Sequence, residues 1–197
     1  NTYFADLNPK GELDNLESVT NEVKLMMDPT ADPFAAPANP EEVPAKFGAS
    51  DVQDLNWVQL LNAYSCTECG RCTSVCPANS TGKKLSPRKI MMDTRDRIEE
   101  VGRNIDANKG VFVPDNKTLL NDYITPEELW ACTSCNACVE ECPVNISPLS
   151  IIMDMRRYLV MEQSAAPMPI NAMMTNIENN GAPWQYSQQD RLNWKNE

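Results

Sequence analysis

The eight cysteines of this 197-residue chain fall into two runs with identical spacing. The first run consists of Cys66, Cys69, Cys72 and Cys76, and the second of Cys132, Cys135, Cys138 and Cys142. Both runs read C-x2-C-x2-C-x3-C-P, because Pro77 and Pro143 directly follow the last cysteines. Thiolates are soft ligands that suit zinc, copper(I) and iron–sulfur clusters. The repetition therefore points to metal chemistry that uses every thiol in the chain.

The spacing matches the bacterial ferredoxin pattern for a pair of [4Fe–4S] clusters. Three cysteines at steps of three residues reach three irons of a cube from one tight loop, and the fourth cysteine of each run ligates the cluster of the other run. The predicted ligands are Cys66, Cys69, Cys72 and Cys142 for the first cluster, and Cys132, Cys135, Cys138 and Cys76 for the second. We therefore expect two [4Fe–4S] clusters as cofactors, with crossed ligation joining the two halves.

Zinc binding and disulfide bonding fit the same cysteines less well. Zinc sites usually combine two separated C-x2-C pairs, whereas each run here has three evenly spaced cysteines before its Cys-Pro. Cysteines three residues apart in a chain with 42% hydrophobic residues do not resemble the staples of a small secreted domain. A reducing compartment follows, so we expect the chain in the cytoplasm or at the cytoplasmic face of a membrane.

Composition and charge exclude several partners and chemistries. The formal net charge is −11, and eight thiolates with two doubly positive cubane cores make it about −15. Nucleic acid is therefore not an expected partner, whereas a basic protein surface is. The chain has no histidine, which removes Rieske-type ligation and the commonest general base. No stretch approaches the roughly 20 apolar residues of a membrane span. Because the chain begins at Asn1, we expect a processed product or a fragment of a longer protein.

Changes in composition divide the chain into four predicted segments. Residues 1–27 are acidic, with apolar residues near helical spacing, and residues 28–49 form a proline-rich linker. Residues 50–184 form the domain that contains both cysteine runs, and residues 185–197 form a polar tail.

Helix-start signals surround each cysteine run. Ser50 with Gln53 predicts a capping box for a helix that leads into the first run, and Thr125 with Glu128 predicts the same before the second. After the runs, Ser86–Arg95 and Ser147–Arg156 share the pattern S-P-x-x-I-[IM]-M-D-x-R, in which serine caps a helix and proline occupies its first position. The sequence therefore predicts a mainly α fold built from a helix, a cluster loop and a helix, repeated twice.

The segment Gly110–Leu120 between the two repeats has short apolar runs on either side of Asp115-Asn116. Turn-forming residues between two apolar runs are typical of a hairpin. We therefore expect a small β-hairpin inserted into the helical fold.

These features resemble the alpha-helical ferredoxin domain of the heterodisulfide reductase-like and glycolate oxidase-like iron–sulfur proteins, and more distantly the iron–sulfur subunit of succinate dehydrogenase. The resemblance covers residues 50–184. Its most specific parts are the cysteine runs, the M-D-x-R-R-Y-L-V-M-E segment from Met153 and the N-N-G-A-P-W segment from Asn179. It implies clusters in series that pass electrons between a flavin, quinone or thiol–disulfide site and another carrier.

The chain departs from this family in one feature, because it has no C-C-G cysteine motif. Proteins of the heterodisulfide reductase type that perform the chemistry add cysteine-rich domains with a C-C-G signature, and this chain has no adjacent cysteines. The resemblance therefore implies a non-catalytic electron-transfer part of an oxidoreductase. Its implied partners are redox proteins, such as a flavoprotein or a membrane quinone-reactive subunit. Similar proteins carry a membrane segment upstream, which the linker would join to the cluster domain.

Two other classes of function compete with an electron relay. The clusters could be redox-silent and order an interaction scaffold, or their loss could report oxygen in a redox sensor. A sensor usually carries a DNA-binding element, and the acidic charge argues against one. Neither alternative explains the duplication, because crossed ligation holds two redox centres at a fixed separation.

Overall fold

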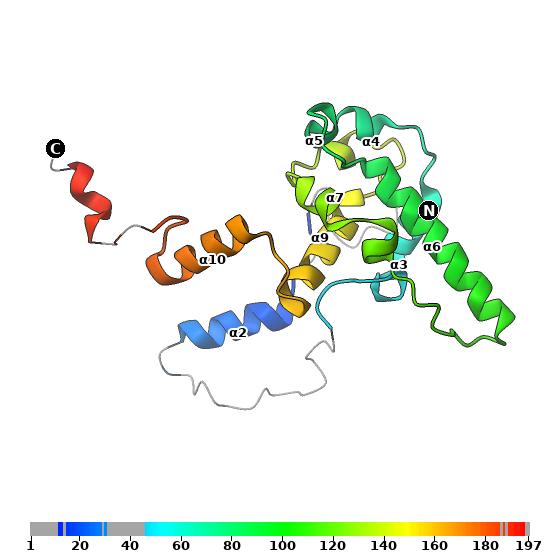
Figure 1. Cartoon of the computed structure of the whole chain (residues 1–197), viewed down its shortest axis with the longest axis horizontal. Helices are drawn as coiled ribbons and strands as arrows, with labels where there is room; N and C mark the ends of the chain where they lie inside the picture. Colours follow the sequence, from blue (N-terminus) through cyan, green and yellow to red (C-terminus); the bar gives the residue numbers. More distant parts are fainter. Residues whose placement is uncertain are drawn as a thin grey trace. The chain divides into compact units, whose positions relative to one another are not determined.

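The computed structural model describes residues 12–13, 15–28, 30, 46–185, 187 and 189–195 (Figure 1). Tertiary contacts divide the chain into two compact units, Asn1–Tyr158 and Leu159–Glu197. All eight cysteines lie in the first unit. Most of the predicted linker at 28–49 lies outside the described residues, and the four segment boundaries remain predictions.

The described residues confirm the mainly helical fold and contain no strand, only an isolated bridge between Leu120 and Ile124. In chain order the first unit contains α2 (Glu17–Met27), η2 (Val52–Asp54), α3 (Trp57–Ser65), α4 (Arg71–Ser74), α5 (Pro77–Ser80), α6 (Pro87–Ala107), η3 (Leu119–Tyr123), α7 (Pro126–Ala131), α8 (Ala137–Glu140) and α9 (Pro148–Arg157). η4 (Tyr158–Glu162) continues from α9, and α10 (Met168–Asn180) and η5 (Asp190–Lys195) belong to the second unit.

The two cysteine runs have the same backbone conformation. α3 and α7 each end one residue before the first cysteine of a run. Two residues after that cysteine, Glu68 and Ser134 have φ values of 56° and 55°, and two residues further on Gly70 and Asn136 have φ values of 80° and 61°. Positive φ reverses the direction of the chain, so each run wraps around a centre before a short helix begins. The repeat predicted from the sequence is therefore also present in the backbone.

The caps expected after the runs and before the second run are confirmed. Ser86 caps α6 and Ser147 caps α9, each with proline at the first helical position. Thr125 and Glu128 form the capping box of α7. These local bonds fix where three helices begin on either side of the cysteine loops.

The predicted capping box of Ser50 and Gln53 is wrong. The expected single helix is instead two elements, η2 capped by Asp51 and α3 capped by a reciprocal box between Asn56 and Gln59. Asp and Asn side chains bind nearby backbone N–H groups and so interrupt a helix in favour of a new cap. The first cysteine run is therefore reached from the shorter helix α3.

The central helix α6 packs against α3, α4, η3 and α9 (Figure 1). The fully buried apolar residues of this contact include Ile90 and Met91 from α6 and Ile151, Ile152 and Met155 from α9. The short helices α4 and α8, which carry cysteines, contact each other, and they also contact α6 and α9 respectively. The core thus holds both cysteine loops against the two helices that follow them.

Gly48 allows the segment before η2 to lie directly on the end of α9. Its φ is 71°, and a Cβ at this position would lie 2.2 Å from the carbonyl oxygen of Asp154 and 2.5 Å from the backbone nitrogen of Tyr158. The neighbouring Ala49 is buried and donates its N–H to the same carbonyl over 3.0 Å. Residues 46–49, which the sequence placed in the linker, therefore pack on the domain.

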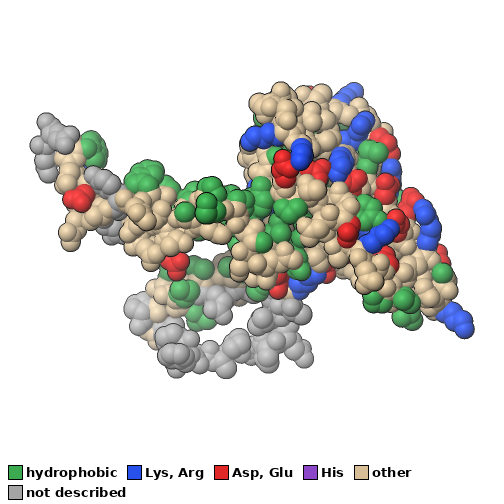
Figure 2. All heavy atoms as spheres, viewed as in Figure 1, with side chains coloured by type: hydrophobic (Ala, Val, Ile, Leu, Met, Phe, Trp, Pro, Cys, Tyr) green, Lys and Arg blue, Asp and Glu red, His purple; other side chains and the backbone are tan. Residues whose placement is uncertain are grey.

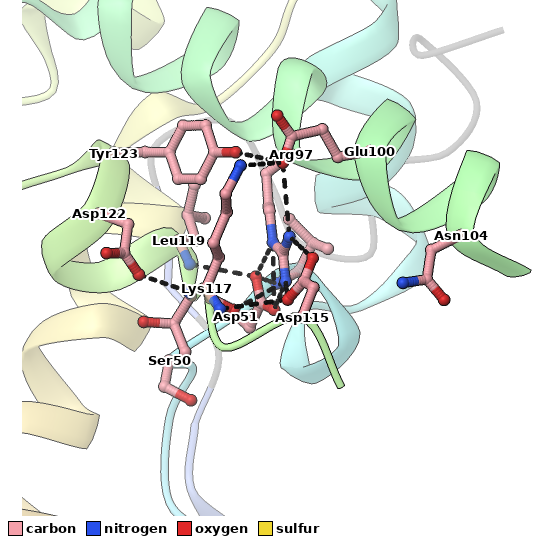
Figure 3. Close-up of polar contacts among 12 residues, drawn as sticks. Ser50, Asp51, Arg97, Glu100, Asn104, Asp115, Lys117, Leu119, Asp122 and Tyr123 are labelled. Carbon is pink, nitrogen blue, oxygen red and sulfur yellow. Dashed lines mark hydrogen bonds and ion pairs between the residues drawn. The ribbon is translucent and has the colours of Figure 1, made fainter. Parts of the chain in front are cut away.

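A fully buried arginine ties three parts of the first unit together (Figure 3). Arg97 of α6 donates from Nε and Nη2 to the carboxylate of Asp51, and from Nη1 and Nη2 to that of Asp115. Its Nη2 also donates to the carbonyl oxygen of Lys117 over 2.8 Å. The guanidinium lowers the pKa of Asp115 to about 2, and the two carboxylates raise the pKa of Arg97. Arg97 and Asp115 thus stay charged near neutral pH.

The hairpin predicted at Gly110–Leu120 is wrong, because residues 110–118 form an irregular loop. Asn104 of α6 both accepts from the backbone nitrogen of Val113 and donates to its carbonyl oxygen, each over 2.9 Å. Pro114 has no N–H for a ladder. Side chains of α6 therefore satisfy backbone groups that a partner strand would otherwise bind.

The second unit is built around α10. Gly181, with φ of 65°, ends this helix, and Arg191 donates to its carbonyl oxygen over 3.0 Å. Figure 2 shows apolar side chains gathered along α10 with few charges among them. The exposed apolar residues here are Met168, Met173, Met174 and Ile177. Among the described helices, none is long and apolar enough to cross a bilayer.

Candidate functional site

The eight cysteines surround two hollows in the first unit. Cys66, Cys69, Cys72 and Cys142 line the first, which measures about 350 Å³ with its open mouth. Cys76, Cys132, Cys135 and Cys138 line the second, which measures about 320 Å³. Each hollow is thus lined by three cysteines from one run and the last cysteine of the other, and Cys138 lines the first hollow in addition. This is the grouping that crossed ligation requires, and the ligand assignment itself stays a prediction.

The two hollows share a wall. Cys138 also lines the first hollow, so this side chain lies between the two sets of thiols. It forms an apolar cluster with Val139 and Leu149, against which Cys72 and Cys132 pack. Buried apolar side chains therefore lie between the two groups of cysteines.

The second hollow is the more deeply buried. Cys76 and Cys138 are 6% and 9% exposed, whereas the first hollow has no buried cysteine among its own predicted ligands. One cysteine of each hollow, Cys69 or Cys135, is exposed. Each hollow therefore has an edge that reaches the surface.

The donor set fits an iron–sulfur cluster better than a single ion. In the described part of the chain, no three His, Cys, Asp or Glu side chains are grouped closely enough to hold one metal ion. A zinc ion would need its thiolates about 2.3 Å away around a single point. Four thiols spread around a hollow suit a larger body that binds one thiolate at each corner, as a cubane does.

Burial opposes ionisation of the thiols in the absence of a metal. It raises the pKa of Cys138 to about 12, with help from the neighbouring cysteines, and it also raises the pKa of Cys72 and Cys132. The exposed Cys135 has a lowered pKa, chiefly because the N–H of Ala137 donates to it. Metals bind cysteine in its thiolate form. The positive charge of a cluster core would therefore stabilise the buried thiolates that line the hollows.

Two arginines near the hollows were not singled out from the sequence. Arg95 of α6 forms an ion pair with Glu68 of the first cysteine loop, with 2.6 Å between Nη2 and Oε1. Arg156 of α9 donates from Nη2 to the carbonyl oxygen of Cys132 over 2.5 Å. Both arginines occupy the last position of the shared S-P-x-x-I-[IM]-M-D-x-R pattern. That repeated position was the signal from which they could have been found.

The fold and the hollows define a helical domain for a pair of [4Fe–4S] clusters, and comparison with known proteins agrees. Residues 65–146 match the family of the 4Fe–4S dicluster domain. The probable iron-sulfur-binding oxidoreductase FadF of Bacillus subtilis is 34% identical over 80% of this chain and 26% of its own length. The EtfAB:quinone oxidoreductase of Syntrophomonas wolfei is 34% identical over 77% of this chain and 24% of its own.

A shorter relative is similar over a larger share of its own length. One subunit of the ferredoxin/F(420)H(2)-dependent CoB-CoM heterodisulfide reductase of Methanosarcina acetivorans is 32% identical over 54% of this chain and 52% of its own length. The chain contains a 4Fe–4S dicluster domain with two [4Fe–4S] clusters as its cofactors, and it is similar to heterodisulfide reductase-like iron–sulfur proteins. It spans about a quarter of the length of the FadF and EtfAB:quinone oxidoreductase relatives.

Proposed function

We propose that this chain is an electron-relay module that passes single electrons through two clusters in series. The observation that carries the proposal is the shared wall at Cys138, a buried side chain that lines both thiol-lined hollows. When bound, each cluster supplies reversible one-electron chemistry. The protein buries Cys138 where the hollows meet and leaves Cys69 and Cys135 exposed.

The proposed ligands follow the grouping of the hollows. Cys66, Cys69, Cys72 and Cys142 would hold the first cluster, and Cys132, Cys135, Cys138 and Cys76 the second. Pro77 and Pro143 turn the chain directly after the crossing cysteines. The thiols of Cys76 and Cys142 can thus bind the cluster in the hollow of the other run.

The partners in this proposal are redox proteins that supply or remove the electrons. The name of the Syntrophomonas wolfei relative points to an electron-transferring flavoprotein and a quinone, and that of the Methanosarcina acetivorans relative to a disulfide. Catalysis would then belong to another domain or subunit. We propose that the chain works in the cytoplasm or at the cytoplasmic face of a membrane, where thiols stay reduced.

An anaerobic redox titration followed by EPR, with iron and sulfide counted on the same sample, tests the relay. We expect about eight irons and two one-electron steps, with spin–spin coupling between the clusters when both are reduced. Clusters that load fully but do not reduce in any accessible range would instead identify a structural scaffold. Bound zinc in place of iron would refute the cluster assignment as well.

A further inference from the structure

We propose that Arg95 and Arg156 are equivalent positioning residues of the internal repeat that set the reduction potentials of the two clusters, and that Glu68 cancels this effect in the first repeat only. The proposal rests on cluster binding as proposed above. It concerns residues that no ligand pattern includes. Each arginine contacts its own cysteine loop.

Arg156 is bound tightly to the second cysteine loop. Its Nε and Nη2 donate to the carbonyl oxygen of Leu129 over 3.0 and 2.6 Å, and Nη2 also donates to the carbonyl oxygen of Cys132. The guanidinium lies 4.9 Å from the ring centre of Trp130 and 3.5 Å from Oγ of Ser134. Carbonyl oxygens carry no formal charge, so the full positive charge of Arg156 remains beside this loop.

Arg95 reaches the equivalent place on the first loop. It pairs with Glu68, which stands two residues after Cys66, just as Ser134 stands two residues after Cys132. The serine of the second loop is uncharged, whereas the glutamate of the first carries a negative charge. The repeat therefore places a cation at both loops and a compensating anion at only one.

This difference has a direct electrostatic consequence. Reduction adds one negative charge to a cluster, and a nearby positive charge favours the more negative state. Arg156 should therefore raise the potential of the cluster beside Cys132. The Arg95–Glu68 pair is close to neutral and should have little net effect on the other cluster. Arg88 also lines the first hollow, but its charge is unchanged in the variants proposed below.

The test compares charge-changing variants of the full chain by EPR-monitored redox titration and iron counting. Arg156→Gln should make one of the two reduction steps more negative. Glu68→Gln should make the other step less negative, because Arg95 then keeps only the more distant carboxylate of Asp96, 3.8 Å from its Nε. Arg156→Lys keeps the positive charge but loses the guanidinium that donates to two carbonyl oxygens. Its reduction potential should therefore lie closer to that of the wild type than the potential of Arg156→Gln does.

Matched controls come from the exposed pair Arg103 and Glu99 on α6, which are 2.9 Å apart. Arg103→Gln and Glu99→Gln change the net charge equally and should leave both steps in place. If Arg156→Gln loses iron, recovery of iron in Arg156→Lys would support positioning, and failure to recover would count against it.

The proposal is overturned if Glu68→Gln, at a side chain that is 40% exposed, retains its iron and leaves both steps unmoved. It is equally overturned if Arg156→Gln and Glu68→Gln shift the same step. A wild-type chain with no reducible cluster would refute the proposed function itself, so the two failures are distinguishable.

Discussion

At the residue scale, the spacing of the cysteines in the sequence predicts which of them lie around the same hollow. The last cysteine of each run lines the hollow of the other run. Cys142→Ser should therefore lose the same cluster as Cys66→Ser, with iron falling to about half of eight. Cys132→Ser is the matched control and should lose the other EPR signal. If Cys142→Ser and Cys132→Ser lose the same signal, ligation is not crossed.

Arg97 is fully buried and joins α6 to Asp51 and Asp115. Arg97→Met would leave the carboxylates of Asp51 and Asp115 without their shared partner, and breaking a buried ion pair costs about 3–5 kcal/mol. Urea unfolding followed by cluster absorbance measures this loss. Arg103→Met, at a side chain that is 74% exposed, should change stability by less than about 0.5 kcal/mol. Equal losses in the two variants would contradict the role of the buried cation.

The pH dependence of the same contact has a definite sign. The pKa of Asp115 is lowered to about 2 in the folded protein, so its contribution is complete above its ordinary value and disappears only as pH falls toward 2. The stability difference between wild type and Asp115→Asn should therefore be constant between about pH 6 and 9. Unfolding midpoints across this range test it, and a difference that varies with pH would show that another group titrates with the contact.

At the scale of elements, the close approach of residues 46–49 to α9 depends on one glycine. Gly48→Ala would place a Cβ 2.2 Å from the backbone oxygen of Asp154, in addition to the left-handed strain of about 1–3 kcal/mol. Gly82→Ala is a matched control, because Gly82 has a φ of 80° with nothing within 4 Å of its Cβ position. Thermal unfolding should show a much larger loss for Gly48→Ala. Similar losses would mean that the segment can move off α9.

Elements with strong local signals formed where the sequence predicted them. Ser86 and Ser147 cap their helices because the cap and its N–H partner lie three residues apart in the chain. The prediction that one helix starts at Ser50 was wrong because Asp51 and Asn56 each cap an element of their own. Local propensity alone does not show which of these competing caps is used. The hairpin failed because its backbone partners are side chains of α6, which sequence pattern does not reveal.

At the scale of the whole molecule, the packed region begins earlier than the predicted linker boundary. A chain that starts at Lys46 should keep full iron content, because it retains Gly48, buried Ala49 and the Lys46–Asp54 ion pair. A chain that starts at Ser50 should unfold at lower temperature and load less iron. Iron content and unfolding midpoints compare the two, and identical behaviour would show that residues 46–49 add nothing to the domain.

The sequence by itself determined the chemistry and the repeated architecture. Thiol spacing, proline positions and serine caps act over three to ten residues, so they can be read without knowing the fold. They predicted two [4Fe–4S] clusters, a helical domain and the grouping of cysteines from both runs. The cluster pair and helical class are confirmed, while the individual ligands remain a prediction supported by the two hollows.

Only the tertiary structure decided how the repeats are held and how they differ electrostatically. Asp51, Arg97 and Asp115 meet although they are far apart in the chain, and ion pairs of this kind have no periodicity in a sequence. Arg95 and Arg156 hold the same place in the repeat, yet one meets a carboxylate and the other meets carbonyl oxygens. The physical reason is that charge compensation depends on distance in space, which the packing of α6 and α9 sets.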